Sequence, residues 1–201
     1  MMGGKILLVA VVGYLLGSLS VSVMLSRAMP GGDVRSYGSG NAGATNMARV
    51  YGLRAGFKTL GGDMLKALLA MWLGNALLGD LGLAVGGGAC MLGHCFPAFH
   101  GFKGGKGISV GAAIGLAIDW RVFLLIALVF LLAALPSKKV SLGSVCAAAA
   151  IVPACLLVHV STPELILAIF GAVLAIYQHR PNIKRLLEGT EADFKAAPEK
   201  R

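Results

Sequence analysis

Three short polar segments interrupt an otherwise apolar chain, and their residue types suit the binding of phosphate. They are residues 38–49 (GSGNAGATNMAR), 93–107 (GHCFPAFHGFKGGKG) and 179–191 (HRPNIKRLLEGTE). Lysine and arginine supply positive charge that lipid rejects, and clustered glycines let backbone N–H groups converge on an anion. If all three segments lie on one side of a membrane, they can form a single pocket for phosphorylated molecules.

The first segment ends in Arg49, a possible bidentate partner for phosphate. Ser39, Asn41, Thr45 and Asn46 precede it as neutral donors, with Gly40 among them. Asn46 and Arg49 are three residues apart, so they share a face if a helix starts near Ala44. An N-capping turn accounts for one or two of these polar residues but not for their density.

The second segment places Lys103 and Lys106 on either side of Gly104 and Gly105, with Gly107 following. This pattern is not a nucleotide P-loop, which needs glycine where His100 stands and serine or threonine where Gly107 stands. Because the surroundings are polar and glycine-rich, Lys103, Lys106 and Arg49 favour anion binding over a simple role in membrane orientation.

In the third segment, His179 and Asn182 lie three apart at the end of the last predicted helix. His179 either takes a proton from an attacking hydroxyl or hydrogen-bonds a phosphate. Arg185 and Glu191 are expected to tie the tail to the other loops. The tail after about Glu188 is predicted to be a frayed end.

The composition defines the environment in which these segments work. The chain of 201 residues is 57% hydrophobic and 13% charged, with a mean hydropathy of +0.79. These values predict one all-α integral-membrane domain over residues 1–201, since helices satisfy their own backbone polar groups in lipid. Glycines such as Gly13, Gly17, Gly82, Gly86, Gly111 and Gly115 indicate close helix packing.

Apolar runs predict seven spans, at 5–26, 57–79, 82–98, 108–119, 121–136, 140–160 and 164–178. The fourth has 12 residues and reaches roughly 18 Å, against about 30 Å of hydrocarbon. The alternative is five spans plus a re-entrant hairpin formed by 82–98 and 108–119. Asp63 and Lys66, near the inner end of the second span, predict a local ion pair with the lysine reaching toward the membrane surface.

Basic residues gather on one set of junctions, which the positive-inside rule assigns to the cytoplasm. The N-terminus is then outside, the C-terminus inside, and all three polar segments face the cytoplasm. This bias explains most of the net charge of +9. No nucleic-acid partner is expected, because the basic residues are divided among short loops.

The sequence gives no sign of a cofactor or a metal. Cys90, Cys95, Cys146 and Cys155 all fall in apolar spans and are expected to be small buried hydrophobes. Taken without any resemblance, an enzyme competes with a small transporter of an anionic metabolite. Polar groups on one side of the membrane, without an internal repeat, favour the enzyme.

The three segments resemble the signature motifs of the PlsY family, the bacterial acyl-phosphate:glycerol-3-phosphate acyltransferases. The pattern GSGNxGATNxxR matches 38–49 at every fixed position, and GHxxPxFxxFKGGKG matches 93–107 in full. The third motif is similar to 179–191 through His179, Asn182, Ile183, Arg185, Gly189 and Glu191. Gln178 and Ser109 depart from what many relatives carry.

The resemblance implies transfer of an acyl group from acyl phosphate to the 1-hydroxyl of glycerol 3-phosphate, giving lysophosphatidate and phosphate. It implies a monomeric, multi-pass enzyme of the bacterial inner membrane. The residues expected to take part in catalysis are Ser39, Arg49, Lys106, His179 and Asn182. Those expected to bind substrate phosphate are Gly40, Asn41, Thr45, Asn46, Lys103, Gly104, Gly105 and Gly107.

Overall fold

A computed structural model describes residues 2–198, and within them all regular structure is helical. The elements are α1 (Met2–Ser18), α2 (Val21–Arg27), η1 (Val34–Ser36), α3 (Ala44–Tyr51), α4 (Leu53–Cys95), η2 (Ala98–His100), α5 (Ile108–Ile118), α6 (Trp120–Ser137), α7 (Val140–Val158), α8 (Thr162–Gln178) and α9 (Arg180–Leu187). The prediction of an all-α chain is confirmed for these residues. A helix does begin at Ala44, so Asn46 and Arg49 lie on consecutive turns of α3.

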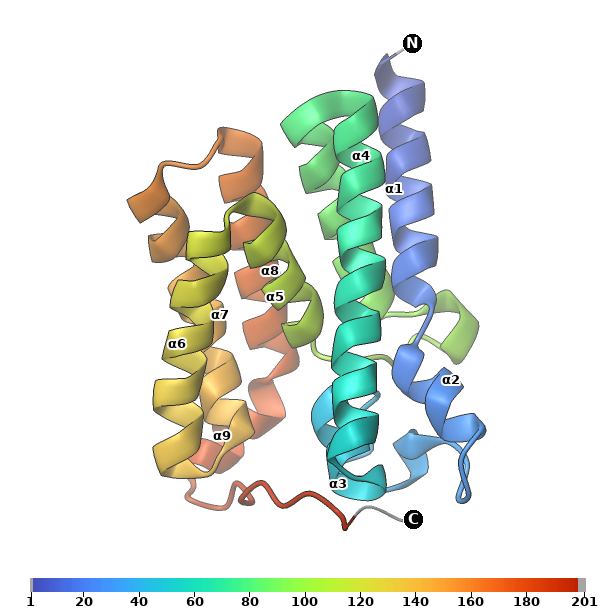
Figure 1. Cartoon of the computed structure of the whole chain (residues 1–201), viewed down its shortest axis with the longest axis vertical. Helices are drawn as coiled ribbons and strands as arrows, with labels where there is room; N and C mark the ends of the chain where they lie inside the picture. Colours follow the sequence, from blue (N-terminus) through green and yellow to red (C-terminus); the bar gives the residue numbers. More distant parts are fainter. Residues whose placement is uncertain (1, 199–201) are drawn as a thin grey trace.

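The long helix α4 is a hairpin of two antiparallel legs (Figure 1). It reverses at Gly79, whose φ of 59° and ψ of −146° are open only to glycine. Beside the turn, a Cβ on Gly74 would lie 2.0 Å from the carbonyl oxygen of Gly82, and a Cβ on Gly82 1.9 Å from that of Gly74. Glycine at both positions therefore lets the legs touch backbone to backbone. The two legs correspond to the predicted spans 57–79 and 82–98.

Glycine also allows the first helix, α1, to pack closely against the second leg of α4. A Cβ on Gly17 would lie 2.1 Å from the carbonyl oxygen of Cys90. Small residues of this kind let helices approach closely where lipid offers no hydrophobic driving force. Gly111 is an exception among the predicted packing glycines, because a Cβ there would meet only open space.

One predicted span is interrupted, and the last predicted span is intact but is followed by a sharp bend. The span 5–26 breaks after Ser18 and continues as α2 from Val21. The last helix ends at Gln178, before His179, and α9 leaves it at 60°. Pro181 in the first turn of α9 has no N–H to continue the α8 ladder, which explains the bend.

The outer surfaces suit a bilayer. Four segments of the described chain are long and apolar enough to cross a membrane, at Met2–Arg27, Leu53–His100, Trp120–Ser137 and Val140–Val158; the bent pair α8–α9 makes a fifth if it counts as one span. On α6, the leucines at 124, 128, 131, 132 and 135 are all exposed. An apolar exterior of this kind marks an integral-membrane protein.

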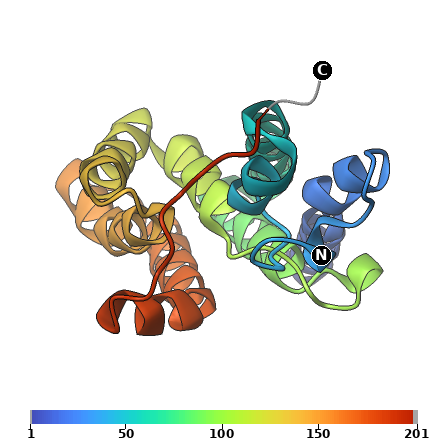
Figure 2. The same ribbon diagram turned by 90° about the horizontal axis from the view of Figure 1, so that it is seen from below.

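The tail crosses one end of the molecule, beside α3 and the turn between α6 and α7 (Figure 2). The Phe194 N–H donates to the carbonyl oxygen of Lys138 at 2.7 Å, and the Ala197 N–H donates to that of Ala48 at 3.1 Å. Lys139 also pairs with Asp193 at 2.8 Å. The prediction of a frayed end is wrong for residues up to 198, because these contacts fasten the tail to the α6–α7 turn and to α3.

Candidate active site

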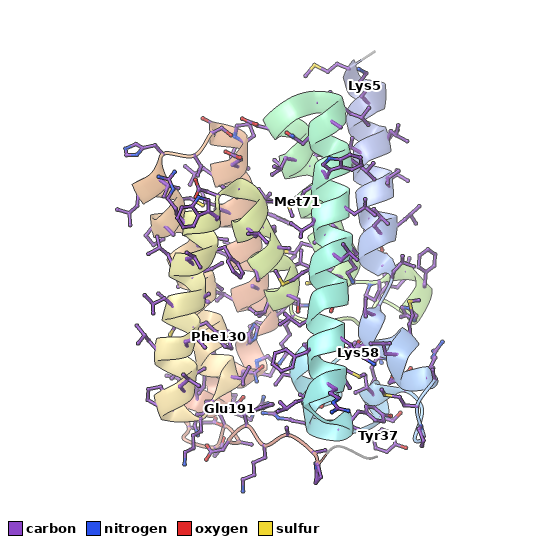
Figure 3. All side chains as sticks on the ribbon, viewed as in Figure 1. Lys5, Tyr37, Lys58, Met71, Phe130 and Glu191 are labelled. Atoms are coloured by element: carbon purple, nitrogen blue, oxygen red, sulfur yellow. The ribbon has the colours of Figure 1, made fainter. Side chains whose placement is uncertain are left out.

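A polar cavity of about 190 Å³ lies where the three polar segments meet. The first segment contributes Ser39, Asn41, Thr45, Asn46 and Arg49, the second Lys106, and the third His179, Asn182 and Glu191. Segments more than 130 residues apart in the chain thus line one space, within a single copy of the protein. Figure 3 shows Lys58 and Glu191 at the end of the molecule opposite Lys5.

Arg49 projects from α3 into this cavity with its guanidinium uncommitted. No hydrogen bond or ion pair joins it to another residue in the range 2–198. A half-buried guanidinium without a carboxylate partner keeps its full capacity for bidentate binding of an anion.

Lys106 begins a chain of polar contacts that joins the second and third segments. Its ammonium donates to Oδ1 of Asn182. The Asn182 amide donates to Glu191 Oε1 at 2.7 Å, and Arg185 Nε donates to Glu191 Oε2 at 2.6 Å. Glu191 is 4% exposed, so both partners are needed to compensate its buried charge. Arg185 and Glu191, expected to tie the tail to the other loops, pair with each other inside the third segment, and Glu191 fixes the orientation of Asn182, which makes the contact with the second segment.

Burial lowers the pKa of Lys106 to about 8, and the positive charges of Arg185 and Arg49 act in the same direction. Near neutral pH the group is still an ammonium. Burial removes part of the water that stabilises this charge, so a bound phosphate would restore stabilisation to the ammonium group.

His179 is held by a backbone contact at the junction of α8 and α9. Its Nδ1 lies 2.7 Å from the carbonyl oxygen of Ala175, which can only accept, so the ring proton is on Nδ1. Nε2 then carries a lone pair. Burial lowers the pKa of His179 to about 4, with the charge of Lys106 contributing, so the ring is neutral at physiological pH. This tautomer accepts a hydrogen bond from a hydroxyl and cannot donate one to phosphate through Nε2.

Asn46 does not offer the free donors that the sequence predicted. Its Oδ1 accepts from the Ser39 N–H at 2.9 Å, and its Nδ2 donates to the carbonyl oxygens of Val34 and Tyr37 at 3.1 and 3.0 Å. Both amide hydrogens are used. Asn46 therefore shapes the loop that carries Ser39, although it lines the cavity.

Lys103 and Gly40 lie outside the polar cavity. They line a separate surface hollow together with Asp33, Arg35 and Ser36. Arg35 donates to the carbonyl oxygen of His100 at 2.7 Å while pairing with Asp33 at 2.8 Å. The hydrogen bond from Arg35 holds the chain just before Lys103 near η1. Lys103 therefore does not line the polar cavity that Lys106 lines.

The glycines of the second segment serve close packing. The Gly105 N–H donates to the carbonyl oxygen of His94 at 3.0 Å and is unavailable to an anion. A Cβ on Gly104 would lie 2.0 Å from the same oxygen, and one on Gly107 2.4 Å from Met91 Cε. None of these three glycines lines the polar cavity. The prediction that their amides cradle phosphate is therefore wrong for Gly105, and the loop is better described as pressed against the end of α4.

Sequence reasoning missed four polar residues of the cavity wall: His94, Ser109, Ser141 and Ser144. Ser141 and Ser144 are one turn apart at the start of α7. Polar residues at that spacing in an apolar run, directly after Lys138 and Lys139, were the available signal. His94 lay within the second motif, but its partners come from the first leg of α4 and are distant in sequence.

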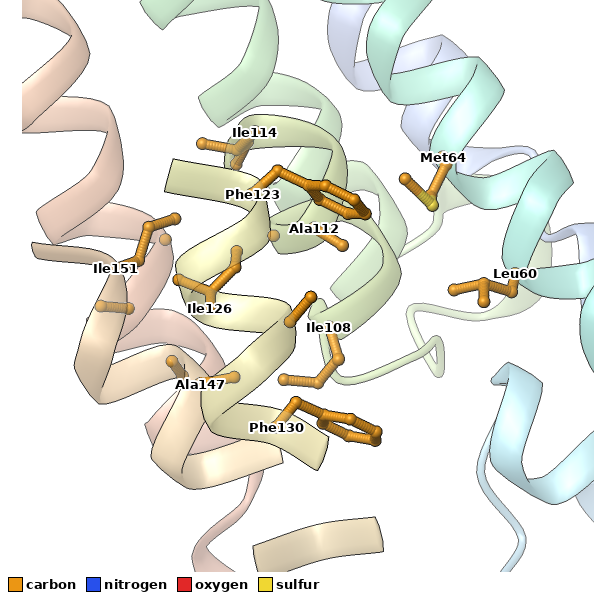
Figure 4. Close-up of a pocket in the computed structure, with 15 residues that line it drawn as sticks. Leu60, Met64, Ile108, Ala112, Ile114, Phe123, Ile126, Phe130, Ala147 and Ile151 are labelled. Carbon is orange, nitrogen blue, oxygen red and sulfur yellow. The ribbon is translucent and has the colours of Figure 1, made fainter. Parts of the chain in front are cut away.

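An apolar cavity of about 240 Å³ adjoins the polar one and shares Leu60, Ile108 and Phe130 with it (Figure 4). Its remaining walls come from α4–α8, with Met64, Ile114, Phe123, Ile126 and Ile151 among them. Gly111 opens onto it, and a larger residue there would reduce the space. The pair of cavities suits a molecule with an anionic head and a hydrocarbon chain.

Comparison with known proteins agrees with this geometry. A family model described as Glycerol-3-phosphate acyltransferase matches residues 7–189. The chain is 38% identical over 189 residues to a glycerol-3-phosphate acyltransferase of Finegoldia magna, covering 93% of this chain and 95% of that one. It is 41% identical over 191 residues to one of Clostridioides difficile, with coverage of 92% and 93%.

Two crystal structures of PlsY, described as an integral membrane glycerol 3-phosphate acyltransferase, superpose on the fold. The glycerol 3-phosphate form gives a TM-score of 0.89 at 35% identity, covering 94% of this chain and 96% of that one. The lysophosphatidic acid form gives 0.87 at 33% identity, covering 94% and 95%.

The fold and site thus define an integral-membrane acyltransferase of phospholipid biosynthesis. The chain belongs to the glycerol-3-phosphate acyltransferase family, the family of PlsY. The alternative of a small transporter is thereby set aside.

Proposed function

We propose that this protein transfers a fatty acyl group from acyl phosphate to the 1-hydroxyl of sn-glycerol 3-phosphate. The products are 1-acyl-sn-glycerol 3-phosphate and inorganic phosphate. The observation that carries the proposal is the junction of the two cavities: Arg49 and Lys106 line the polar one, and Leu60, Ile108 and Phe130 open it onto the apolar one. Two phosphates repel each other, so a site holding both needs more than one cation.

In this reaction the substrate hydroxyl attacks the acyl carbonyl carbon, and the bond from that carbon to the phosphate oxygen breaks. Phosphate is a good leaving group, so alignment and charge stabilisation supply most of the rate. Arg49 and Lys106 hold the anionic groups. The acyl chain occupies the apolar cavity beside Gly111 and Phe123.

His179 orients the attacking hydroxyl through the lone pair on Nε2. With a pKa of about 4, the imidazole is a weak base, and the departing phosphate is the better acceptor for the hydroxyl proton. His179→Ala is therefore expected to lower kcat less than the ~10²–10⁴-fold typical of a general base. A loss of that full size, measured at saturating substrate, would assign the proton transfer to His179 instead.

The experiment that tests the donor gives the purified protein labelled glycerol 3-phosphate with acyl phosphate or with acyl-CoA. Product is expected with acyl phosphate alone. Product formation from acyl-CoA alone would show that the donor is assigned wrongly. Because one copy of the chain lines both cavities, we also propose that the monomer is active, so activity should accompany the monomer peak in size-exclusion chromatography.

We further propose seven spans in the bacterial inner membrane, with the N-terminus outside and the polar cavity facing the cytoplasm. The charge distribution supports this: Lys58 lies with the cavity residue Glu191 towards one end of the molecule, while Lys5 lies at the other (Figure 3). A cysteine placed at Lys58 should react with membrane-impermeant thiol reagents only after the membrane is opened. Reaction in intact cells would reverse the orientation.

A further inference from the structure

A cluster of charged side chains lies buried in the first leg of α4. Asp63 is 1% exposed and Lys66 6% exposed, and their carboxylate and ammonium groups are 2.8 Å apart. The prediction that Lys66 reaches toward the membrane surface is wrong. Charges inside a membrane domain are costly unless paired, and they mark functional positions. Neither residue lines the polar cavity, so an effect of the pair on the cavity must pass through a neighbouring residue.

One role of Lys66 is structural. Its ammonium donates to the carbonyl oxygens of Gly17 at 3.0 Å and Leu19 at 2.7 Å, where α1 ends. A helix C-terminus leaves carbonyl groups without partners, and the lysine satisfies two of them across the packed α1–α4 interface. Together with the carboxylate of Asp63, these carbonyl groups place three oxygens around an ammonium that has three hydrogens.

A fourth and longer contact of Lys66 is with His94 on the second leg of α4. His94 Nδ1 lies 3.2 Å from Lys66 Nζ and 3.6 Å from Asp63 Oδ1. An ammonium has hydrogens to give and no lone pair. Because the positive charge of Lys66 lies nearer to Nδ1 than the carboxylate of Asp63 does, it favours a lone pair on Nδ1, which leaves the ring proton on Nε2.

The opposite side of the His94 ring faces the site. A Cβ on Gly105 would lie 2.1 Å from His94 Nε2 and 3.1 Å from the carbonyl oxygen of Ala42. Nε2 thus lies close to Gly105 of the second polar segment, beside Ala42 of the first. His94 lines the polar cavity, and within residues 2–198 Nε2 has no hydrogen-bond acceptor.

We propose that His94 contacts substrate, donating its Nε2–H to a phosphoryl oxygen in the polar cavity, and that Asp63 and Lys66 are positioning residues that fix this tautomer. The inference rests on the proposed placement of phosphorylated substrates in that cavity. His94 and His179 then play opposite parts: His179 presents a lone pair to a hydroxyl, and His94 presents an N–H to an anion. The oxygen belongs either to glycerol 3-phosphate or to the acyl phosphate, which share this chemistry.

The tautomer is measured on the wild-type protein without substrate. In detergent-solubilised protein labelled with ¹⁵N-histidine, long-range ¹H–¹⁵N spectra distinguish the two neutral forms, and loss of one signal set in His94→Asn assigns it. We expect protonated Nε2 at His94 and protonated Nδ1 at His179. Protonated Nδ1 at His94 would overturn the proposal, whatever the variants do.

Kinetics of two isosteric variants test the contact itself. His94→Asn keeps an oxygen to accept from Lys66 but has no group at the Nε2 position, whereas His94→Gln places an amide N–H there. We expect His94→Asn to raise one KM about 10- to 100-fold, the range for a hydrogen bond to a charged group, and His94→Gln to recover part of it. The substrate whose KM rises identifies the phosphoryl group. Unchanged KM values for both substrates in a folded His94→Asn would refute the contact.

Two further variants separate positioning from folding. The double variant Asp63→Asn/Lys66→Met removes both charges without leaving one unpaired; it should lose the Nε2–H tautomer preference and raise the same KM. If it keeps the wild-type tautomer, the positioning role is wrong. His159→Asn is the matched control, since His159 is exposed in a left-handed conformation that asparagine tolerates. If Arg49→Ala also leaves KM unchanged, the proposed site fails; if only His94→Asn does, this inference alone fails.

Discussion

Arg49→Ala should lower kcat/KM for glycerol 3-phosphate by about 10² to 10⁴-fold, because hydrogen bonds to charged groups contribute about 1.5–3 kcal/mol each and a guanidinium makes two to phosphate. Folding should be unaffected, since Arg49 has no hydrogen bond or ion pair within the described residues. The measurements are steady-state kinetics with acyl phosphate and the melting temperature in detergent.

Lys58→Ala is the matched control for Arg49. Lys58 is an exposed cation on the first turns of α4, close in sequence but outside the polar cavity. It should keep wild-type kinetics. Equal losses in the two variants would mean that Arg49 acts through the general surface charge, and normal turnover in Arg49→Ala would remove this residue from the site.

Lys106→Met should produce a loss of at least ~10²-fold, because the variant removes a cation and leaves Asn182 Oδ1 without its donor. The pH dependence of kcat/KM in the wild-type protein should also reflect the charge of Lys106. Since the pKa of Lys106 is about 8, the ammonium is present below that pH and is lost above it. Glycerol 3-phosphate is already a dianion there, its second pKa being about 6, so kcat/KM should fall as pH rises through 8.

The fall should be smaller in kcat, because bound phosphate favours the charged lysine and raises its pKa in the complex. Lys106→Met should show no such inflection between pH 7 and 9. Lys184→Met is the control, since Lys184 is 76% exposed and pairs only loosely with Glu188 at 3.8 Å. A pH profile shared by wild type and Lys106→Met would assign the titration to another group.

The parts of this site that sequence could predict are those whose chemistry conflicts with their surroundings. Arg49, Lys106, His179 and Asn182 stand in polar segments of an apolar chain, and their polarity alone marks them. The seven apolar runs likewise became helices, because backbone satisfaction in lipid leaves little choice.

What sequence could not predict depends on contacts between distant residues. Nothing near Asn46 shows that its amide will be used by the loop before it, and nothing near Lys66 shows that His94 and the end of α1 will surround it. The kink before α9 was not predicted, although Pro181 offered a local signal for it. Local sequence patterns identify the polar residues of the site, whereas tertiary contacts determine which of their atoms remain free to bind a substrate.

The ordered tail has a practical consequence for handling the protein. A purification tag fused to the C-terminus continues a tail that is fastened to Lys138 and Ala48, close in sequence to Ser141 and Arg49 of the cavity wall. A bulky or highly charged fusion there can obstruct entry of the water-soluble acceptor. An N-terminal tag starts at the opposite end of the molecule (Figure 1), and is the safer choice for kinetic work.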